Sequence, residues 1–136
     1  MKKVLLVGVF DLFHFGHLRL IQRAATLGDY LIAAVQEDGY ILKHKPTEAY
    51  YSTEERIEMI RALRVVDEVI SYKDIADDIK TIDFDVFVKG PDQTHSGFLS
   101  ATEWCEANGK SVVTLPRTDG ISSTYLKQLL EDFAKR

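Results

Sequence analysis

The 136-residue sequence contains one cysteine, Cys105, and no long uninterrupted apolar run. A single cysteine excludes an internal disulfide and is typical of a protein kept in a reducing compartment. The apolar run after Met1 is too short for a signal peptide and ends without a small-residue cleavage site. No segment approaches the length of a membrane span. We therefore expect a cytoplasmic protein without a membrane partner.

Positive charge is also scarce. The chain has 17 lysines and arginines against 21 aspartates and glutamates, and its formal net charge is −4. A surface that binds nucleic acid is normally basic, so this balance argues against a nucleic-acid partner. Any phosphate chemistry in this protein must therefore depend on local groups of donors and cations.

The apolar pattern predicts one α/β domain that comprises residues 1–136. Short apolar runs of the buried-strand type occur at residues 3–9, 30–35, 65–70, 85–89 and 112–115. Between these runs, and after the last one, apolar residues at helical spacing or capping residues predict helices. The expected helices are at 18–27, from 52 onward, and at 75–82, 98–107 and 122–133. Residues 36–51 are polar and are expected to form a loop. This order predicts a single doubly wound, Rossmann-like, five-stranded parallel sheet with helices on both faces.

Two histidines, His14 and His17, lie where the first expected strand turns into the first expected helix. The first amides of a helix are unpaired and carry the positive end of its dipole, so such a junction favours phosphate. Gly16 has no Cβ, which lets an anion approach the backbone closely. The imidazoles add donors that are neutral or cationic near neutral pH. One histidine here would suggest only a helix cap, but the complete pattern favours function.

A second polar stretch, residues 116–124, precedes the last expected helix. Arg117 offers a planar fork of donors that suits phosphate oxygens. Gly120 permits a tight bend, and Ser122, Ser123 and Thr124 bring hydroxyls and amides to a helix start. In a parallel sheet the carboxyl ends of the strands share one edge, where ligands bind. We expect the side chains that follow strands to converge there: His14, His17, Lys43, Lys45, Asp92 and Arg117.

The pattern His-x-Gly-His after a strand that ends in Gly-x-Phe-Asp resembles the nucleotidyltransferase superfamily. Residues 117–124 read Arg-Thr-Asp-Gly-Ile-Ser-Ser-Thr. They are similar to the Arg-Thr-x-Gly-Ile-Ser-Thr-Thr signature of cytidylyltransferases, and of glycerol-3-phosphate cytidylyltransferases most of all. The likeness continues through residues 27–31, 50–56 and 66–70. It implies transfer of CMP from CTP to a small phosphorylated acceptor, a polyol or sugar phosphate such as glycerol 3-phosphate, with release of pyrophosphate.

The resemblance also implies roles for individual residues. The expected catalytic residues are His14, His17, Lys45 and Arg117. Nucleotide binding is expected from Val9, Phe10, His14, His17, Lys43, Arg117, Thr118, Gly120, Ile121, Ser122, Ser123 and Thr124. Acceptor binding is expected from Asp11, Lys45, Asp92 and Gln93. Mg²⁺ is expected to bridge the nucleotide phosphates without direct protein ligands. Arg64 lies in a segment that resembles the family's dimer contact, which implies a homodimer.

Several alternatives remain open. Lys43 and Lys45 are equally well explained as solvated loop residues. Glycerol-3-phosphate enzymes have Gly-Asp-Asp-Trp where residues 90–93 read Gly-Pro-Asp-Gln. This difference predicts that a larger acceptor, which could hydrogen-bond to Gln93 or His95, is used more efficiently than glycerol 3-phosphate.

Two other functions fit parts of the pattern. Residues 119–124 also match the Asp-Gly-x-Ser-Ser-Thr pattern of ATP-dependent heptose-phosphate adenylyltransferases. A nucleotide-binding regulator without turnover is a further alternative, against which the presence of both histidines and Arg117 argues. Arg56, which has glutamates close by in its expected helix, is expected to form surface ion pairs.

Overall fold

The computed structural model describes residues 1–41, 49–91, 93–116 and 123–135, with Ser123 and Thr124 described as backbone only. Five strands form one sheet: β1 (Lys3–Gly8), β2 (Tyr30–Gln36), β3 (Glu68–Tyr72), β4 (Val86–Lys89) and β5 (Ser111–Thr114). All neighbouring strands pair in parallel, in the order β3-β2-β1-β4-β5. The five-stranded parallel sheet expected from the sequence is confirmed.

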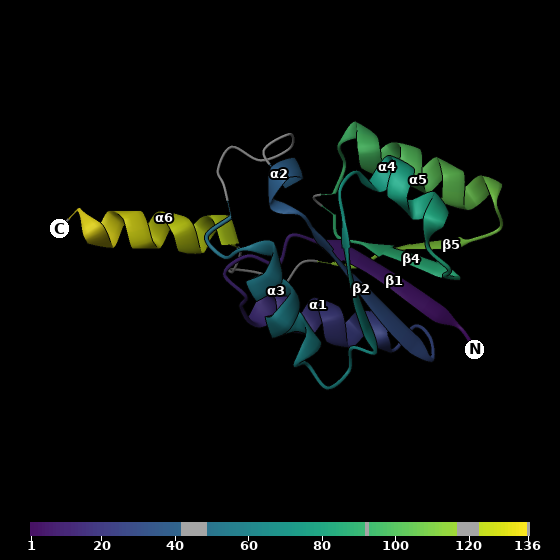
Figure 1. Ribbon diagram of the computed structural model, residues 1–136, viewed down its shortest axis with the longest axis horizontal. Coiled ribbons are helices and arrows are strands. Elements are labelled where there is room, and N and C mark those ends of the chain that lie inside the picture. Colours follow the sequence, from purple (N-terminus) through teal and green to yellow (C-terminus); the bar gives the residue numbers. More distant parts are fainter. Residues whose placement is uncertain (42–48, 92, 117–122, 136) are drawn as a thin grey trace.

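Helices lie on both faces of this sheet (Figure 1). They are α1 (Phe15–Ala25), α2 (Asp38–Ile41), α3 (Thr53–Arg61), α4 (Ile75–Asp78) with the 3-10 turn η1 (Ile79–Thr81), α5 (Ser96–Ala107) and α6 (Ser123–Ala134). The side chains of successive β1 residues point to opposite faces of the sheet. Val4 and Leu6 pack with Ile21 of α1 and Ile60 of α3. Leu5 and Val7 belong to the core that α4, η1 and α5 complete. Helix α6 extends away from this body toward the carboxyl terminus (Figure 1).

The expectations for residues 65–70 and 36–51 differ from the structure. Strand β3 begins at Glu68 instead of residue 65, because Asp67 is used as a cap: its carboxylate accepts a 2.8 Å hydrogen bond from the Leu31 amide at the start of β2. The expected loop at 36–51 contains the short helix α2, whose Ile41 is buried. Both differences arise from contacts between segments that are distant in the sequence.

Arg56 of α3 is completely buried, so the expectation of surface ion pairs was wrong. Its guanidinium has five N–H groups, and each has an acceptor. The acceptors are the carbonyl oxygens of Tyr51 (3.0 Å), Val9 (2.9 Å) and Gln36 (2.8 Å), Asp38 Oδ1 (2.6 Å) and Thr53 Oγ1 (3.4 Å). These acceptors follow β1, lie at the end of β2 and the start of α2, and precede or begin α3. One side chain therefore ties together three segments at the carboxyl edge of the sheet.

We predict that Arg56→Met destabilises the protein by about 3 kcal/mol or more, because it leaves three buried carbonyl groups and Asp38 without their donor. Arg56→Lys should also destabilise it, since an ammonium group has three donors and cannot match five acceptors. Urea unfolding curves provide the measurement. Arg61→Met on the exposed end of the same helix is the matched control and should change stability by less than about 0.5 kcal/mol. Equal unfolding midpoints for the Arg56 and Arg61 variants would contradict the role given to Arg56.

Candidate active site

The site lies at the carboxyl ends of β1 and β4, where the chain switches direction across the sheet. From β1 the chain continues through α1 to β2 on one side, whereas β4 lies on the other side of β1. In open parallel sheets this switch point is where ligands bind. The turn after β4 is fixed against β1: Gln93 Nε2 donates to Val7 O at 3.0 Å and its Oε1 accepts from the Gly90 amide at 2.9 Å.

The connection from β1 to α1 is a compact turn with unusual backbone angles. Phe10 and Leu12 have positive φ values of 55° and 46°, which side-chain-bearing residues rarely adopt. The Phe10 ring folds back over Gly8, where an added Cβ would lie 3.0 Å from the ring. A side chain at Gly8 would therefore press against the Phe10 ring. Such conformations cost about 1 kcal/mol or more each and persist where the surroundings fix them, commonly at functional sites.

His14 and His17 close the start of α1 as a pair of caps. His14 Nδ1 accepts from the Gly16 amide at 3.0 Å, and His17 Nδ1 accepts from the His14 amide at 3.2 Å. A ring nitrogen that accepts a hydrogen bond carries no proton, so each neutral imidazole holds its proton on Nε2. The caps thus select one tautomer for both rings. The Gly16 amide is bonded to His14 Nδ1, so it is not available to an anion in the way expected from the sequence.

Aromatic packing further restricts the two rings. The His14 and His17 rings stack with centroids 3.9 Å apart. Phe13 stacks on His17 at 5.5 Å, and Phe10 meets the same ring edge-on at 5.7 Å. With rotation limited in this way, two Nε2–H donors are held in place before any ligand binds. Preorganised donors of this kind are what stabilises charge that develops during a reaction.

Asp11 joins the histidine turn to two other segments. Its carboxylate is 3% exposed and accepts from the amides of Tyr50 (2.8 Å) and Tyr51 (3.1 Å) and from Lys127 Nζ of α6 (3.0 Å). Burial by itself raises the pKa of Asp11, but these backbone and lysine hydrogen bonds outweigh burial and lower the pKa below its ordinary value. Asp11 therefore remains a carboxylate that positions residues 50–51 and α6. Its expected role in acceptor binding stays a prediction.

The remaining expected site residues divide into described and undescribed ones. Val9, Phe10, Asp11, His14 and Gln93 are described and lie on the turns after β1 and β4, and His17 lies in the first turn of α1. Ser123 and Thr124 begin α6. The others lie outside the described residues: Lys43, Lys45, Asp92, Arg117, Thr118, Gly120, Ile121 and Ser122. Gln93 is engaged with backbone groups at both ends of its amide, so the structure shows it holding the turn.

Sequence reasoning missed two positioning residues, Arg56 and Lys127. A signal existed for Arg56, because it lies three residues after Thr53 and four before Ile60, on the buried stripe of α3. Lys127 had no comparable signal, since its partner Asp11 is far away in the sequence. Within the described part of the chain no group of three metal-ligating side chains occurs, and no helix is long and apolar enough to cross a membrane.

The sequence profile of the cytidylyltransferase-like family matches residues 5–129. The chain belongs to this family. It is 43% identical over 131 residues to glycerol-3-phosphate cytidylyltransferase of Bacillus subtilis strain 168, an alignment that covers 94% of this chain and 96% of the relative. It is 42% identical over 135 residues to the enzyme of the same name from Staphylococcus aureus strain NCTC 8325, with 96% of each covered.

A solved structure shares the fold of this cytidylyltransferase-like chain. The lipopolysaccharide core biosynthesis protein from Thermoplasma volcanium GSS1 superposes with a TM-score of 0.76 and 24% identity, covering 88% of this chain and 99% of that one. The expected family and the doubly wound α/β fold are thus confirmed, and the protein is a nucleotidyltransferase enzyme.

In this enzyme the histidines can be tested apart from the helix caps they form. His14→Asn keeps an N-cap acceptor, and His17→Gln keeps the usual N3 partner of a capping box, but each removes an Nε2–H donor. We predict that each lowers kcat for pyrophosphate release by about a hundredfold or more with little change in melting temperature. His14→Ala, which loses cap and donor together, should also lose about 1 kcal/mol of stability. Unchanged kcat in His14→Asn or His17→Gln would remove that histidine from the reaction.

Proposed function

We propose that this cytidylyltransferase-like enzyme transfers CMP from CTP to a small phosphorylated acceptor, glycerol 3-phosphate, and releases pyrophosphate. The observation that carries the proposal is a pair of fixed Nε2–H donors at the switch point of a chain 43% identical to a glycerol-3-phosphate cytidylyltransferase. The arrangement suits two polyanions that must be held in line while negative charge moves between phosphate oxygens.

In the proposed reaction an oxygen of the acceptor phosphate attacks the α-phosphorus of CTP. The bond from the α-phosphorus to its bridging oxygen breaks, and the electron pair leaves with pyrophosphate. His14 and His17 donate from Nε2 to the oxygens on which this charge develops. No covalent enzyme intermediate is required, so catalysis consists of positioning and charge stabilisation.

The other expected residues complete this proposal. Arg117, Thr118, Gly120, Ile121 and the hydroxyl-bearing residues 122–124 hold the β and γ phosphates, while Lys43 and Lys45 close over the triphosphate or the acceptor. The described residues on either side of residues 42–48 are joined to each other. Asp38 and Thr53 exchange hydrogen bonds of 3.0 and 3.1 Å, which joins the two sides of that segment next to Arg56.

We propose that Mg²⁺ is held mainly by the nucleotide phosphates and supplies charge neutralisation there. The carboxylate nearest the histidines supports this view, because Asp11 is occupied by two amides and Lys127 and is poorly placed to serve as a metal ligand. A cytoplasmic homodimer, with the exposed Arg64 near the contact, is part of the same proposal.

A larger phosphorylated polyol or sugar is the second candidate acceptor. The sequence of the turn at residues 90–93, which differs from that of glycerol-3-phosphate enzymes, favours it. The side-chain amide of Gln93 is bonded to Gly90 and Val7, which argues against Gln93 as a hydrogen-bond partner of that acceptor. The extent of the match to the curated relatives favours glycerol 3-phosphate. The same experiment distinguishes the two candidates.

The test combines CTP, ATP, GTP and UTP, each with Mg²⁺, with a panel of acceptor phosphates of increasing size. We expect CTP with glycerol 3-phosphate to give the highest kcat/KM and a product that contains both CMP and glycerol phosphate. We also expect CTP at ten times its dissociation constant to stabilise the protein by about 1.4 kcal/mol, a melting shift of a few degrees.

Each other outcome has a defined meaning. A higher kcat/KM for a longer acceptor would establish the second candidate. A preference for ATP would replace the cytidylyl assignment by an adenylyl one. Binding of CTP without pyrophosphate release from any acceptor would identify a nucleotide-binding regulator.

A further inference from the structure

Helix α6 contacts the body of the molecule near its start and extends beyond the body for the rest of its length (Figure 1). Its later apolar side chains are not covered by the body: Leu129 is 45% exposed, Leu130 56% and Phe133 72%. A helix of 12 residues is only marginally stable in water by itself. The position of α6 therefore depends on groups near its start that reach the body.

Lys127 is such a group, and its ammonium is largely removed from water. Its side chain is 15% exposed, that of its partner Asp11 is 3% exposed, and the two charged groups meet at 3.0 Å. The same ammonium lies 5.1 Å from the centre of the Tyr50 ring. A charge in such surroundings is stable only when it is paired, so removing one partner here costs far more than at the surface. The ion pair is therefore a firm attachment of α6.

This attachment lies close to the starts of two helices. Lys127 follows Ser123, the first residue of α6, by about one helical turn, and helical side chains lean toward the amino terminus of their helix. Asp11 belongs to the turn that leads to His14, the N-cap of α1. One ion pair thus holds the start of α6 beside the turn that carries the histidines. Because each helix start is the positive end of a dipole, the pair sets the spacing of two groups that attract phosphate.

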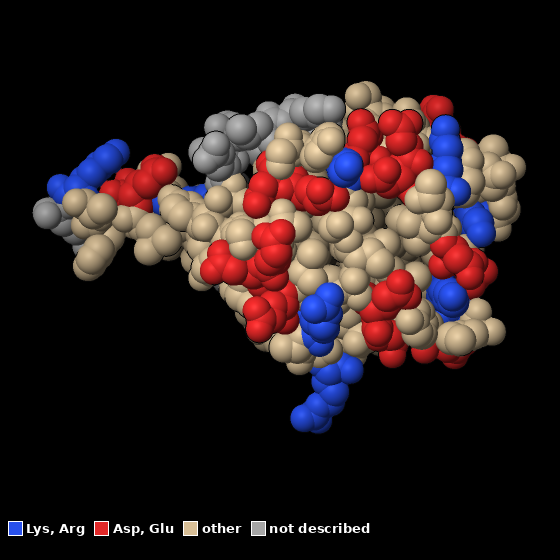
Figure 2. Space-filling model, in the orientation of Figure 1, with Lys and Arg blue, Asp and Glu red and all other residues tan. Residues whose placement is uncertain are grey.

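The charge of Asp11 makes Lys127 important for an anionic ligand as well. The chain has a formal charge of −4, and acidic side chains are prominent on the molecular face seen in Figure 2. The protein as a whole therefore does not attract a triphosphate. Beside the histidine turn Lys127 neutralises Asp11, and Asp38 neutralises Arg56 at 2.6 Å. Without Lys127, the buried Asp11 carboxylate would repel phosphate groups bound at the histidines.

We propose that Lys127 is a positioning residue for nucleotide binding. Its ion pair with Asp11 sets the start of α6 against the histidine turn, and its charge removes the repulsion that Asp11 would exert on the phosphates. Lys127 acts through Asp11 and through α6, without touching the nucleotide. The inference rests on the proposed function in one respect, namely that the ligand of the histidine turn is a nucleoside triphosphate.

Hydrogen exchange of the ligand-free protein tests the attachment. Lys127→Met removes the charge and keeps an unbranched side chain. Because α6 loses its ion pair in this variant, we expect its amides to exchange with solvent about tenfold faster than in the unmodified protein. Exchange in the central strands should not change, which shows that the variant remains folded.

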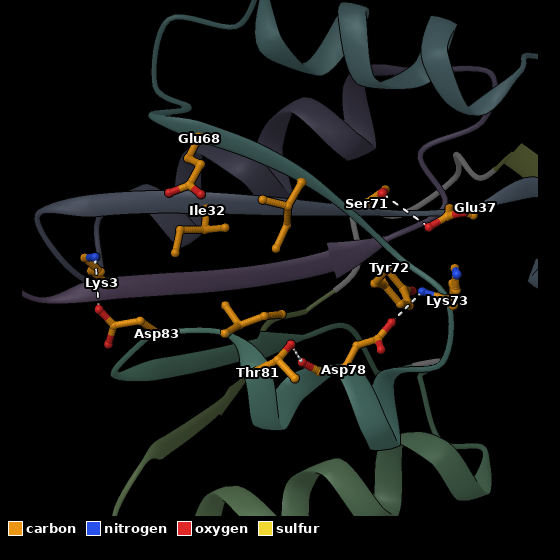
Figure 3. A pocket seen from close by; sticks show the side chains of 12 residues that line it. Lys3, Ile32, Glu37, Glu68, Ser71, Tyr72, Lys73, Asp78, Thr81 and Asp83 are labelled. Atoms are coloured by element: carbon orange, nitrogen blue, oxygen red, sulfur yellow. Dashed lines mark hydrogen bonds and ion pairs between the residues drawn. The ribbon is translucent and has the colours of Figure 1, made fainter.

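Lys3→Met is the matched control. Lys3 also pairs with an aspartate, Asp83 at 3.2 Å (Figure 3), and its ammonium also lies near a tyrosine ring, 5.4 Å from the centre of Tyr30. It is the first residue of β1 and therefore belongs to the edge of the sheet opposite the histidines. The control changes the net charge equally, and α6 should exchange in it as in the unmodified protein.

Calorimetric titration with CTP and Mg²⁺, and with inorganic tripolyphosphate and Mg²⁺, tests the effect on binding. At physiological ionic strength, where long-range charge effects are screened, we expect Lys127→Met to raise both dissociation constants about tenfold and Lys3→Met to change them less than about twofold. Lys127→Arg, which can still pair with Asp11, should bind within about threefold of the unmodified protein. In turnover, Lys127→Met should raise KM for CTP about tenfold and change kcat less than about threefold.

A double variant separates the charge of Lys127 from its other contacts. Asp11→Asn with Lys127→Met has neither the ammonium nor the carboxylate that the ammonium neutralises. We expect it to bind CTP more tightly than Lys127→Met alone, by about threefold, because no uncompensated buried charge faces the phosphates. A lysine that served only as packing would give the opposite order, since the double variant loses more contacts.

Three results would overturn the proposal: unchanged exchange of α6 in Lys127→Met, unchanged nucleotide affinity in that variant, or a double variant that binds CTP no more tightly than Lys127→Met. Failure of the proposed function has a different signature. Binding of CTP or tripolyphosphate without pyrophosphate release from any acceptor contradicts the proposed function alone, and the exchange and binding results still decide the role of Lys127. If the unmodified protein binds neither ligand, both proposals are wrong.

Discussion

A guanidinium group removed from water is stable only if each of its N–H groups meets an acceptor. Arg56 satisfies this condition through groups contributed by the β1 turn, the end of β2, the start of α2 and the residues before α3. The carbonyl groups of Tyr51, Val9 and Gln36 in turn accept hydrogen bonds from Arg56. The carboxyl edge of the sheet is therefore fixed by a polar interaction inside the fold, in addition to the apolar cores on the two faces.

This fixed edge explains how the histidine turn keeps its shape. The Val9 carbonyl is held by Arg56, Phe10 folds over Gly8, and Asp11 binds residues 50–51 and Lys127. Residues with positive φ are thereby enclosed between anchored neighbours. The turn delivers His14 and His17 to the start of α1 with their Nδ1 atoms committed to amides. In the proposed reaction these are the donors that meet the developing charge without reorganising.

The sequence predicted those parts that depend on local patterns. Apolar runs of valine, leucine and isoleucine located the strands, and their alternation with helices gave the parallel sheet. The spacing of His14 and His17 predicted a candidate site at the turn from β1 to α1, which stays a prediction. Arg56 was misassigned because a charged residue near glutamates normally lies at the surface, whereas its burial depends on carbonyl groups far away in the chain. The tautomer of the histidines was likewise not predictable, since it follows from cap geometry. The start of β3 depended on a side-chain cap at Asp67.

The fold fixes both imidazoles as Nε2–H donors. Long-range proton–nitrogen correlation spectra of protein containing isotope-labelled histidine measure this directly, because they distinguish protonated from unprotonated ring nitrogens. At neutral pH we expect His14 and His17 each to carry one proton, on Nε2, and CTP with Mg²⁺ to shift the Nε2 signals while Nδ1 stays unprotonated. A proton on Nδ1 of either ring in the free protein would contradict it.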